Sequence, residues 1–357
     1  MQIAYCPNSI NLKAPGDYRR FVGYCVLNKI KFKILYNSNL EDLSDGDFDF
    51  VVVTMASDLT FWANNNFNKT KIIFECVDSY VFLNNYKIKN ILRAPAKYFS
   101  GQHSSFYLNY LDIIKIIARK SYAVVCSTKK QRDFFVNFCS NVNVILDYHS
   151  SFISQIKKDF SFKKKNEFNL VWEGLPENIC FNEFANEVIE FINKYNSDLS
   201  NKIKIKLNVF TDLYFKKYMN RFYLQNSFYN LKKKTDHIYF HEWNIENINK
   251  NIIENDLAII PLSQSNPLEY GKPANKLFLF FKMGMPTITS NTFAYTEVEK
   301  SFDLKFTFKN ITEFEQLLNI YMKKSEIRKE YSKKAINYIN TELPETKLSK
   351  LWSGIFK

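Results

Sequence analysis

Histidine is scarce in this chain, and the usual signatures of metal-binding proteins are missing. The 357 residues include four His, none in an HExxH arrangement, and six scattered Cys that form no CxxC pair. A structural zinc site needs such ligands at short, regular spacings. We therefore expect no structural zinc site, and we interpret the cysteines as reduced thiols.

Long apolar runs and nucleotide-binding fingerprints are missing as well. No stretch approaches the roughly 18–20 apolar residues that cross a bilayer. Residues 1–6 form a short apolar run without the basic and long hydrophobic regions of an export signal. No GxGxxG follows any predicted strand, which disfavours a nicotinamide-dependent enzyme. We expect a cytoplasmic protein, with the inner face of the cytoplasmic membrane as a candidate location.

Positive charge and aromatic side chains are abundant instead. The 49 Lys and Arg exceed the 36 Asp and Glu, for a formal net charge of +13. Such a balance favours anionic partners. No helix-turn-helix or RNA-binding signature accompanies the lysines, so nucleic acid is not an expected partner. The 34 Phe and 22 Tyr, with frequent Lys, Asn and Ile, are typical of an AT-rich genome and carry little information about a ligand.

Short apolar runs alternate with helical patterns along the first half of the chain. Their continuous Val, Ile and Phe content is typical of strands buried on both faces. This βα alternation favours a parallel, doubly wound sheet. We predict strands at 2–6, 33–36, 50–54, 71–76, 123–127 and 143–146, with helices at 18–28, 107–120 and 129–139.

A polar, lysine-rich segment at 152–167 resembles a linker, and the alternation restarts after it. We predict strands at 169–172, 203–210, 238–240, 257–260 and 287–289, and helices at 182–195, 213–223, 245–254 and 275–283. The expected architecture is α/β, with two Rossmann-like domains, 1–155 and 166–335, facing across a cleft. A C-terminal helix, 336–357, is a candidate to cross back to the first domain. Ligands of such sheets bind outside the carboxyl ends of the strands.

The stretch 270–290, YGKPANKLFLFFKMGMPTITS, carries the clearest sign of a phosphate site. A polar loop leads into a helix, and Lys272 and Lys276 fall near its first turn. Backbone N–H groups and the helix dipole attract anions there, whereas cations are unfavourable unless an anion is bound. We therefore predict a diphosphate site, with a further hydrogen bond from Asn275. Ordinary surface lysines on an amphipathic helix are the alternative.

This stretch resembles the donor-binding helix of GT-B glycosyltransferases, where a lysine-containing helix precedes a small–Gly–x–Pro turn into a Val/Ile strand. The preceding DLAIIPLSQSNPLEYGKP resembles the family's Asp-x-Ala/Val-Ile-x-Pro strand and donor loop. Similar segments follow the family's order at 121–135 (SYAVVCSTKKQRDFF), 169–174 (NLVWEG) and 238–243 (IYFHEW). The similarity covers most of the chain and points to the family-4-like enzymes of bacterial surface polysaccharides.

The resemblance implies a transferase that moves a sugar from a nucleotide sugar to a bacterial surface glycan or lipid-linked acceptor, without a metal or a resident cofactor. Many retaining members carry a Glu in the donor helix that binds the ribose. Leu279 occupies that position here, and Glu269 or Glu297 could substitute. The resemblance also implies that Trp243 borders the base. The full donor-binding set is Gly174, Trp243, Glu269, Lys272, Asn275, Lys276, Ser290 and Glu297.

The first domain is implied to hold the acceptor. A Pro-Gly turn precedes Asp17, Arg19 and Arg20 at a helix opening. The two arginines suit a phosphate or acidic sugar. Asp17 is the first candidate for a general base, with helix capping as the alternative. Asp78 is the second candidate, with a turn role as the alternative, and His103 is an acceptor-binding candidate unless it is structural.

Residues 86–120 interleave basic and apolar side chains, as peripheral membrane segments do. Lys87, Lys89, Arg93 and Lys97 supply the charge. One buried face with a solvated basic edge is the alternative interpretation.

Two other functional classes share a two-lobed layout. A non-hydrolysing sugar-nucleotide epimerase needs several convergent acids and histidines, and histidine is scarce here. A two-lobed ligand-binding protein of the periplasmic type predicts an export signal, which residues 1–6 do not suggest. The glycosyltransferase interpretation is therefore preferred, and it rests largely on analogy of fold.

Overall fold

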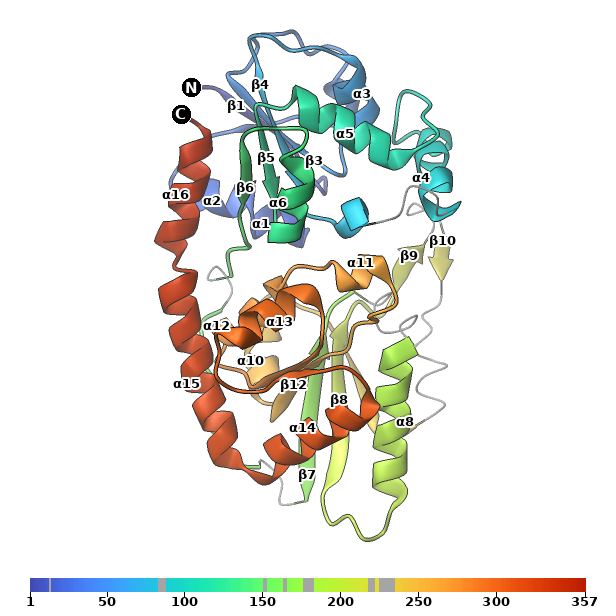
Figure 1. Cartoon of the computed structure of the whole chain (residues 1–357), viewed down its shortest axis with the longest axis vertical. Coiled ribbons are helices and arrows are strands. Elements are labelled where there is room, and N and C mark those ends of the chain that lie inside the picture. Colours follow the sequence, from blue (N-terminus) through green and yellow to red (C-terminus); the bar gives the residue numbers. More distant parts are fainter. Residues whose placement is uncertain are drawn as a thin grey trace. The chain divides into compact units, whose positions relative to one another are not determined.

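The structure is a computed structural model and describes residues 1–12, 14–82, 88–149, 153–162, 166–175, 183–217, 222–224 and 235–357 (Figure 1). The chain forms two compact units. Unit 1 comprises Met1–Tyr148, Gly271–Pro273 and Pro344–Lys357, and unit 2 comprises His149–Tyr270 and Ala274–Leu343. Each unit contains its own six-stranded sheet.

The sheet of unit 1 is parallel throughout, with the strand order β2-β1-β3-β4-β5-β6. Strand order reverses between β1 and β3, so the carboxyl ends of these two strands flank a switch point. The strands are β1 (Ile3–Cys6), β2 (Lys33–Ile34), β3 (Phe50–Thr54), β4 (Lys71–Cys76), β5 (Ala123–Cys126) and β6 (Val142–Val144).

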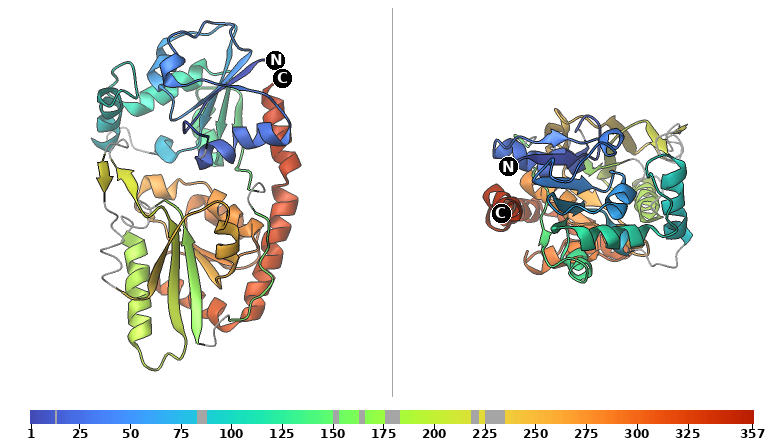
Figure 2. Two further views of the ribbon diagram at one scale, coloured as in Figure 1. Left: turned by 180° about the vertical axis from the view of Figure 1, so that it is seen from behind. Right: turned by 90° about the horizontal axis from the view of Figure 1, so that it is seen from above.

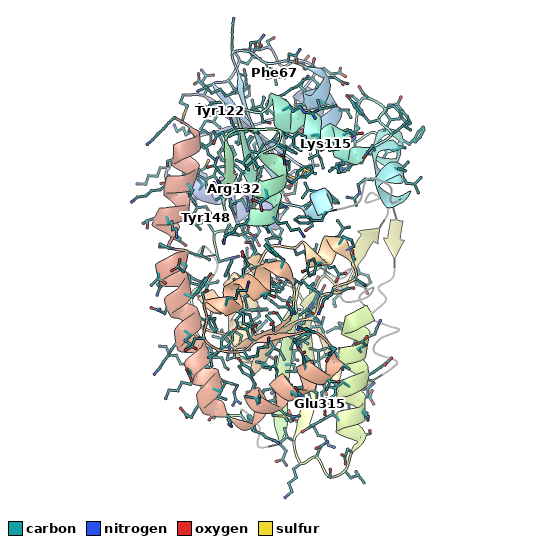
Figure 3. All side chains as sticks on the ribbon, in the orientation of Figure 1. Phe67, Lys115, Tyr122, Arg132, Tyr148 and Glu315 are labelled. Carbon is teal, nitrogen blue, oxygen red and sulfur yellow. The ribbon has the colours of Figure 1, made fainter. Side chains whose placement is uncertain are left out.

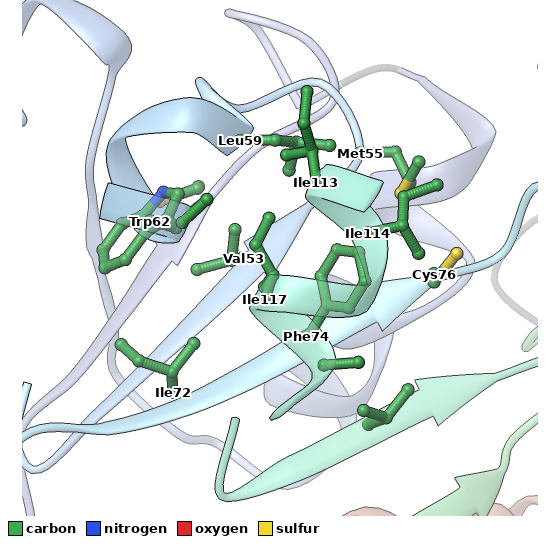
Figure 4. Packing of buried hydrophobic residues seen from close by; sticks show 14 of the residues in the cluster. Val53, Met55, Leu59, Trp62, Ile72, Phe74, Cys76, Ile113, Ile114 and Ile117 are labelled. Carbon is green, nitrogen blue, oxygen red and sulfur yellow. The ribbon is translucent and has the colours of Figure 1, made fainter. Parts of the chain in front are cut away.

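Helices cover both faces of this sheet, which explains its uninterrupted apolar strands. Val51 and Val53 face a core that includes Trp62 and Ile117, whereas Val52 faces the opposite core (Figure 4). The helical elements are α1 (Pro15–Tyr18), α2 (Phe21–Leu27), η1 (Asn37–Asn39), α3 (Leu59–Asn64), η2 (Ser79–Phe82), α4 (Ile88–Phe99), α5 (Tyr110–Lys120), α6 (Lys129–Phe135) and α16 (Glu345–Ile355).

Polar side chains set where several of these helices begin. Asp58 caps α3 by accepting the backbone N–H groups of Thr60 and Phe61. Thr128 and Gln131 form a reciprocal capping box at the start of α6. These caps satisfy backbone donors that have no partner within the helix. They fix the start of α3 and α6 at the carboxyl edge of the sheet, directly after β3 and β5.

Unit 2 has the strand order of a dinucleotide-binding sheet, β11-β8-β7-β12-β13-β14, and all its neighbours are parallel. The order reverses between β7 and β12, which pair directly. The strands are β7 (Glu167–Glu173), β8 (Lys204–Thr211), β11 (Ile238–Glu242), β12 (Leu257–Ile260), β13 (Thr287–Ser290) and β14 (Thr307–Phe308).

An aromatic layer holds the helices of unit 2 together. Phe281 on α12 lies 4.9 Å from Phe302 and 5.7 Å from Tyr331 of α15, measured between ring centroids. The helices are α8 (Glu183–Ser197), α10 (Ile248–Ile253), α11 (Pro267–Tyr270), α12 (Asn275–Lys282), α13 (Phe293–Lys300), α14 (Ile311–Lys323) and α15 (Ser325–Glu342).

The predicted α/β architecture with two Rossmann-like parts is confirmed, and the predicted strands occur at or within a few residues of their expected positions. The helix predicted at 213–223 is wrong. That segment contains the antiparallel pair β9 (Phe215–Lys217) and β10 (Phe222–Leu224). Its apolar residues happen to have helical spacing, but Phe and Tyr favour strands. The helix predicted at 18–28 is divided into α1 and α2 at Arg19–Arg20.

The C-terminal helix α16 belongs to unit 1, where it lies beside α2 (Figure 2). Trp352 is fully buried between the rings of Phe21 and Tyr24, at centroid distances of 5.6 and 5.8 Å. The hydroxyl of Tyr148, labelled in Figure 3, lies 3.3 Å from Ser349 Oγ on the same helix. Within the described residues, no helix is both long enough and apolar enough to span a bilayer.

We predict that Trp352→Ala lowers the free energy of unfolding of unit 1 by about 3–5 kcal/mol, because it leaves a cavity among buried rings. Leu351→Ala on the exposed side of α16 is the matched control and should cost less than about 1 kcal/mol. Urea unfolding followed by circular dichroism measures both. Equal effects of the two substitutions would show that α16 does not stabilise unit 1 through this contact.

Candidate functional site

The carboxyl edge of the unit 2 sheet is organised around Lys276. Its side chain extends from the first turn of α12 to the end of β7, where the ammonium donates to the backbone carbonyl of Glu173. It also lies 4.8 Å from the centroid of the Trp172 ring. Lys276 therefore places a positive charge at the switch point between β7 and β12.

Gly174 is required by this arrangement. Its φ of +149° lies in a region that favours glycine, and its N–H donates to the Phe210 carbonyl at 3.1 Å. A Cβ at this position would collide with Lys276 Nζ and come within 3.2 Å of the Trp172 ring. The glycine thus keeps the space above the end of β7 open for the lysine and for any ligand bound beside it.

Several buried polar atoms along this edge have no hydrogen-bond partner among the described residues. Asn275 Oδ1 lies at the start of α12, and no side chain caps that helix. Thr211 Oγ1 ends β8, and Thr292 Oγ1 precedes α13. Buried polar groups are normally paired, so these three atoms are candidates for contact with a polar ligand. Sequence reasoning missed both threonines, because a single Thr after a strand has no distinctive pattern.

Two other predicted donor residues shape the loops at this edge. Ser290 Oγ accepts the Leu262 N–H at 2.7 Å, which joins the ends of β12 and β13. Glu269 on α11 accepts the Ser263 N–H at 2.7 Å, which holds the loop after β12. The structure therefore brings both residues to the edge, where their contacts organise the backbone.

The remaining predicted donor residues are more dispersed. Trp243 directly follows β11, and its backbone N–H donates to the Thr211 carbonyl at 3.0 Å. Glu297 is half-buried on α13, and Leu279 is 1% exposed in the core. Lys272 lies in the segment Gly271–Pro273, which groups with unit 1. The functional roles predicted for these residues stay predictions.

Glu173 is an acidic residue that sequence reasoning missed at this edge. Its side chain is 5% exposed, and it follows Trp172 at the end of β7. Burial and then the charge of Glu173 raise the pKa of the Tyr295 phenol on α13. The signal available in the sequence was a Glu immediately before the glycine of NLVWEG.

In unit 1, Asp17 organises the loop that follows β1. Its Oδ1 accepts from Tyr5 Oη at 2.6 Å and from the Asn8 N–H at 2.7 Å. Its Oδ2 accepts from the Ser9 N–H at 3.0 Å and from Ser9 Oγ at 2.7 Å. The side chain is fully buried and does not cap α1. These contacts give Asp17 a structural role and weigh against its use as a base.

Arg20 is a structural cation as well. It is 1% exposed and donates to Glu75 Oε1 at 2.6 Å and to Asp147 Oδ1 at 3.0 Å. Burial alone would lower the pKa of Arg20, but the two carboxylates raise it, so the guanidinium stays charged. Arg19 is 8% exposed, and its guanidinium lies 5.4 Å from the centroid of the Tyr18 ring. The contacts of Arg20 link β4 to the end of β6.

Asp78 and His103 belong to the surroundings of Arg93 and Lys97 on α4. Asp78 follows β4 with its side chain accessible to solvent but surrounded by protein atoms. The resulting desolvation raises its pKa, although Arg93, Lys97 and Lys272 oppose that shift. His103 is 3% exposed and stacks on Tyr110 at 6.1 Å. Burial and the nearby Lys97 lower the pKa of His103 to about 4, so its imidazole is neutral. Among the described residues, no group of three or more His, Cys, Asp or Glu could hold a metal ion.

We predict that Asp17→Asn lowers the free energy of unfolding by about 2 kcal/mol, because an amide NH₂ would face donors that now share a carboxylate oxygen. Asp42→Asn, at an exposed acid, is the control and should be neutral. Chemical denaturation measures both. Unchanged stability together with a large loss of sugar transfer would restore Asp17 as the candidate base.

Solved structures with the same architecture are glycosyltransferases. Alr3699/HepE from Anabaena, in complex with UDP and glucose, aligns with a TM-score of 0.65 and 10% identity over 100% of this chain and 99% of its own. WaaG, a glycosyltransferase involved in lipopolysaccharide biosynthesis, aligns with a TM-score of 0.58 and 12% identity over 98% and 99%. TarM aligns with a TM-score of 0.61 and 11% identity over 90% of this chain, which spans 57% of the TarM chain.

No protein-family model and no curated protein matches the sequence. The likeness to the solved structures extends along nearly the whole chain, although the identities are low. It therefore establishes the architecture, and the resemblance seen in the sequence is confirmed at that level. This chain has the fold of the GT-B glycosyltransferases.

Proposed function

We propose that this protein is a glycosyltransferase that takes a sugar from a nucleotide diphosphate sugar. The observation that carries the proposal is the lysine at the β7–β12 switch point. Lys276, the uncapped start of α12 and the glycine at 174 form a positively charged, backbone-lined position at the edge where doubly wound sheets bind nucleotides. The UDP complex of Alr3699/HepE supports UDP as the first nucleotide to test.

The chemistry of the step fits the residues at this edge. When the bond between the sugar and the diphosphate breaks, negative charge develops on the leaving oxygen. Lys276 and the N–H groups at the start of α12 would stabilise that charge without reorganising, which is an effective form of electrostatic catalysis. Asn275 Oδ1, which is without a partner among the described residues, would accept a hydrogen bond from the nucleotide sugar.

Asp78 is the carboxylate we propose for the acceptor hydroxyl. It is exposed at the carboxyl end of β4, whereas Asp17 is buried and already accepts several hydrogen bonds. A carboxylate with a raised pKa is a better proton acceptor near neutral pH. The proposed acceptor is a bacterial surface glycan or its lipid-linked precursor, as the function of WaaG in lipopolysaccharide biosynthesis suggests.

We predict that Lys276→Met weakens UDP binding at least tenfold, because a charge-assisted hydrogen bond contributes about 1.5–3 kcal/mol. Lys282→Met removes a cation from the last turn of the same helix and should leave UDP affinity unchanged. Isothermal titration calorimetry of the two folded variants gives the comparison. If wild-type protein binds no nucleotide diphosphate, or if both variants bind UDP equally well, the proposed donor site is wrong.

We also propose that the α4 region docks on an anionic membrane surface. Lys87 lies outside the described residues, as does the side chain of Lys89. Tyr98, Phe99 and Phe106 form an exposed ring cluster with centroid distances of 5.5–6.4 Å. An exposed apolar surface on the same helix as Arg93 and Lys97 suits a contact with a membrane interface. This α4 apolar patch consists of Ile91, Leu92, Tyr98, Phe99, Phe106 and Leu108.

We predict that wild-type protein floats with vesicles containing phosphatidylglycerol and is released at high salt, because screening weakens the attraction. Phe99→Ser with Leu92→Ser should reduce binding by roughly tenfold or more through the lost apolar burial. Leu199→Ser, at a position 95% exposed in unit 2, is the control. Equal flotation of the patch variant and the control would exclude the α4 apolar patch as the docking surface.

A further inference from the structure

We propose that Arg93 and Lys97 form an anion subsite in unit 1 that binds a phosphate or diphosphate ester carried by the acceptor. The assignment of this ligand to an acceptor rests on the proposed glycosyltransferase function, whereas the subsite itself does not. Arg93 and Lys97 are the α4 cation pair, and Tyr80, Tyr110 and His103 are the residues around it.

The two cations are held on the same aromatic support. They are separated by one helical turn of α4 and therefore lie on one side of it. The guanidinium of Arg93 lies 4.0 Å from the centroid of the Tyr80 ring and 5.8 Å from that of Tyr110. The ammonium of Lys97 lies 4.8 Å from the Tyr110 centroid and 3.0 Å from its hydroxyl. The rings of Tyr80 and Tyr110 are themselves 5.5 Å apart and perpendicular.

The pair lacks a neutralising partner in direct contact. Among the described residues, no carboxylate oxygen lies within ion-pairing distance of Arg93 or Lys97. Asp78 and, to a smaller extent, Asp58 attract Lys97 through space without an ion pair in contact. Asp58 caps α3 and accepts the Ser104 N–H at 2.8 Å. Burial and the charge of Arg93 lower the pKa of Lys97 to about 8. Two cations held together at this cost indicate a site that an anion completes.

His103 provides an independent observation. Both of its ring nitrogens are buried and have no hydrogen-bond partner among the described residues. The ring stacks on Tyr110, the residue that also supports Lys97. A neutral imidazole has one N–H donor, and leaving it buried without an acceptor is unfavourable. An anionic oxygen bound at the α4 cation pair would provide that acceptor.

The donor set selects phosphate over carboxylate. A planar carboxylate is satisfied by the fork of one arginine, whereas a phosphate ester has three outward oxygens. Here the guanidinium of Arg93, the ammonium of Lys97 and the imidazole of His103 lie 5.8, 4.8 and 6.1 Å from the Tyr110 ring centroid and offer donors of three kinds. The sequence suggested Arg19 and Arg20 for this task, but Arg20 is paired with Glu75 and Asp147, and Arg19 is buried beside the Tyr18 ring. The acceptor phosphate is therefore assigned to α4.

The test measures pyrophosphate binding by calorimetry while the donor site is saturated with UDP. We expect wild-type protein to bind one pyrophosphate under these conditions. Arg93→Gln with Lys97→Gln should weaken that binding at least tenfold and leave UDP affinity unchanged. The control is Lys115→Gln with Arg119→Gln, a pair with the same spacing on α5. Lys115, labelled in Figure 3, already pairs with Asp112 at 3.3 Å.

The dependence on pH provides a second readout. Lys97 faces Arg93 on α4, Asp58 at the start of α3, Asp78 after β4, and His103 and Tyr110. Because its pKa in the free protein is about 8, Lys97 loses its proton as the pH rises from 7 to 9, and affinity should fall. Lys97→Arg stays charged over this range and should keep its affinity. The ratio between the two proteins cancels the ionisation of pyrophosphate itself.

Binding to vesicles distinguishes a lipid-linked acceptor from a soluble phosphorylated acceptor as the source of the phosphate. Flotation compares phosphatidylcholine vesicles with and without a polyprenyl diphosphate, using protein that carries Phe99→Ser and Leu92→Ser to remove apolar docking. Pyrophosphate-reversible binding to the diphosphate vesicles assigns the subsite to a lipid-linked acceptor. Calorimetric binding without flotation assigns it to a soluble phosphorylated acceptor, and both results support the subsite.

Three results would overturn the subsite: no pyrophosphate binding beside UDP, equal binding by the α4 double variant and the α5 control, or the same pH dependence in Lys97→Arg as in wild type. Failure of the proposed function gives a different pattern, in which UDP does not bind while pyrophosphate still does and depends on Arg93 and Lys97.

Discussion

Parallel pairing of buried strands is the constraint on which the rest of this structure depends. It points every carboxyl strand end in one sheet toward the same edge, and helices covering both faces leave that edge as the place for polar loops. In unit 2 the edge collects Gly174, Lys276 and Ser290 from segments far apart in the chain. In unit 1 it collects Asp17, Asp78 and the start of α3. The candidate sites follow from strand order rather than from local sequence.

Burial separates two kinds of charged residue that the sequence presents alike. Arg20 is fully buried and paired with Glu75 and Asp147, because a buried cation without partners would be very unfavourable. Arg93 and Lys97 are half-buried on aromatic rings and have no carboxylate in contact within the described part of unit 1. The first arrangement stabilises the fold, whereas the second leaves positive charge for a ligand.

The cations and the apolar patch of α4 both fit the proposed function. One side carries the cation pair, and the apolar patch with Leu92 and Phe99 is exposed to solvent. A phosphorylated lipid acceptor combines the same two features, an anionic group and an apolar chain. An enzyme that receives such an acceptor at a membrane surface needs a cationic contact and an apolar contact close together.

The sequence by itself determined the α/β class, the buried strands and the helix that begins at Asn275, because continuous apolar runs and the YGKPANKLFLFF stretch are local signals. It also placed Gly174 and Lys276 in one site, although only through a family resemblance. Only the tertiary structure decided which polar residues already have hydrogen-bond or ion-pair partners. Asp17 was predicted as a catalytic base and Arg20 as an acceptor-binding residue, and the structure shows both of them buried against Tyr5, Ser9, Glu75 and Asp147. Spacing along a chain cannot reveal such partners, since hydrogen bonds and ion pairs depend on distance in space.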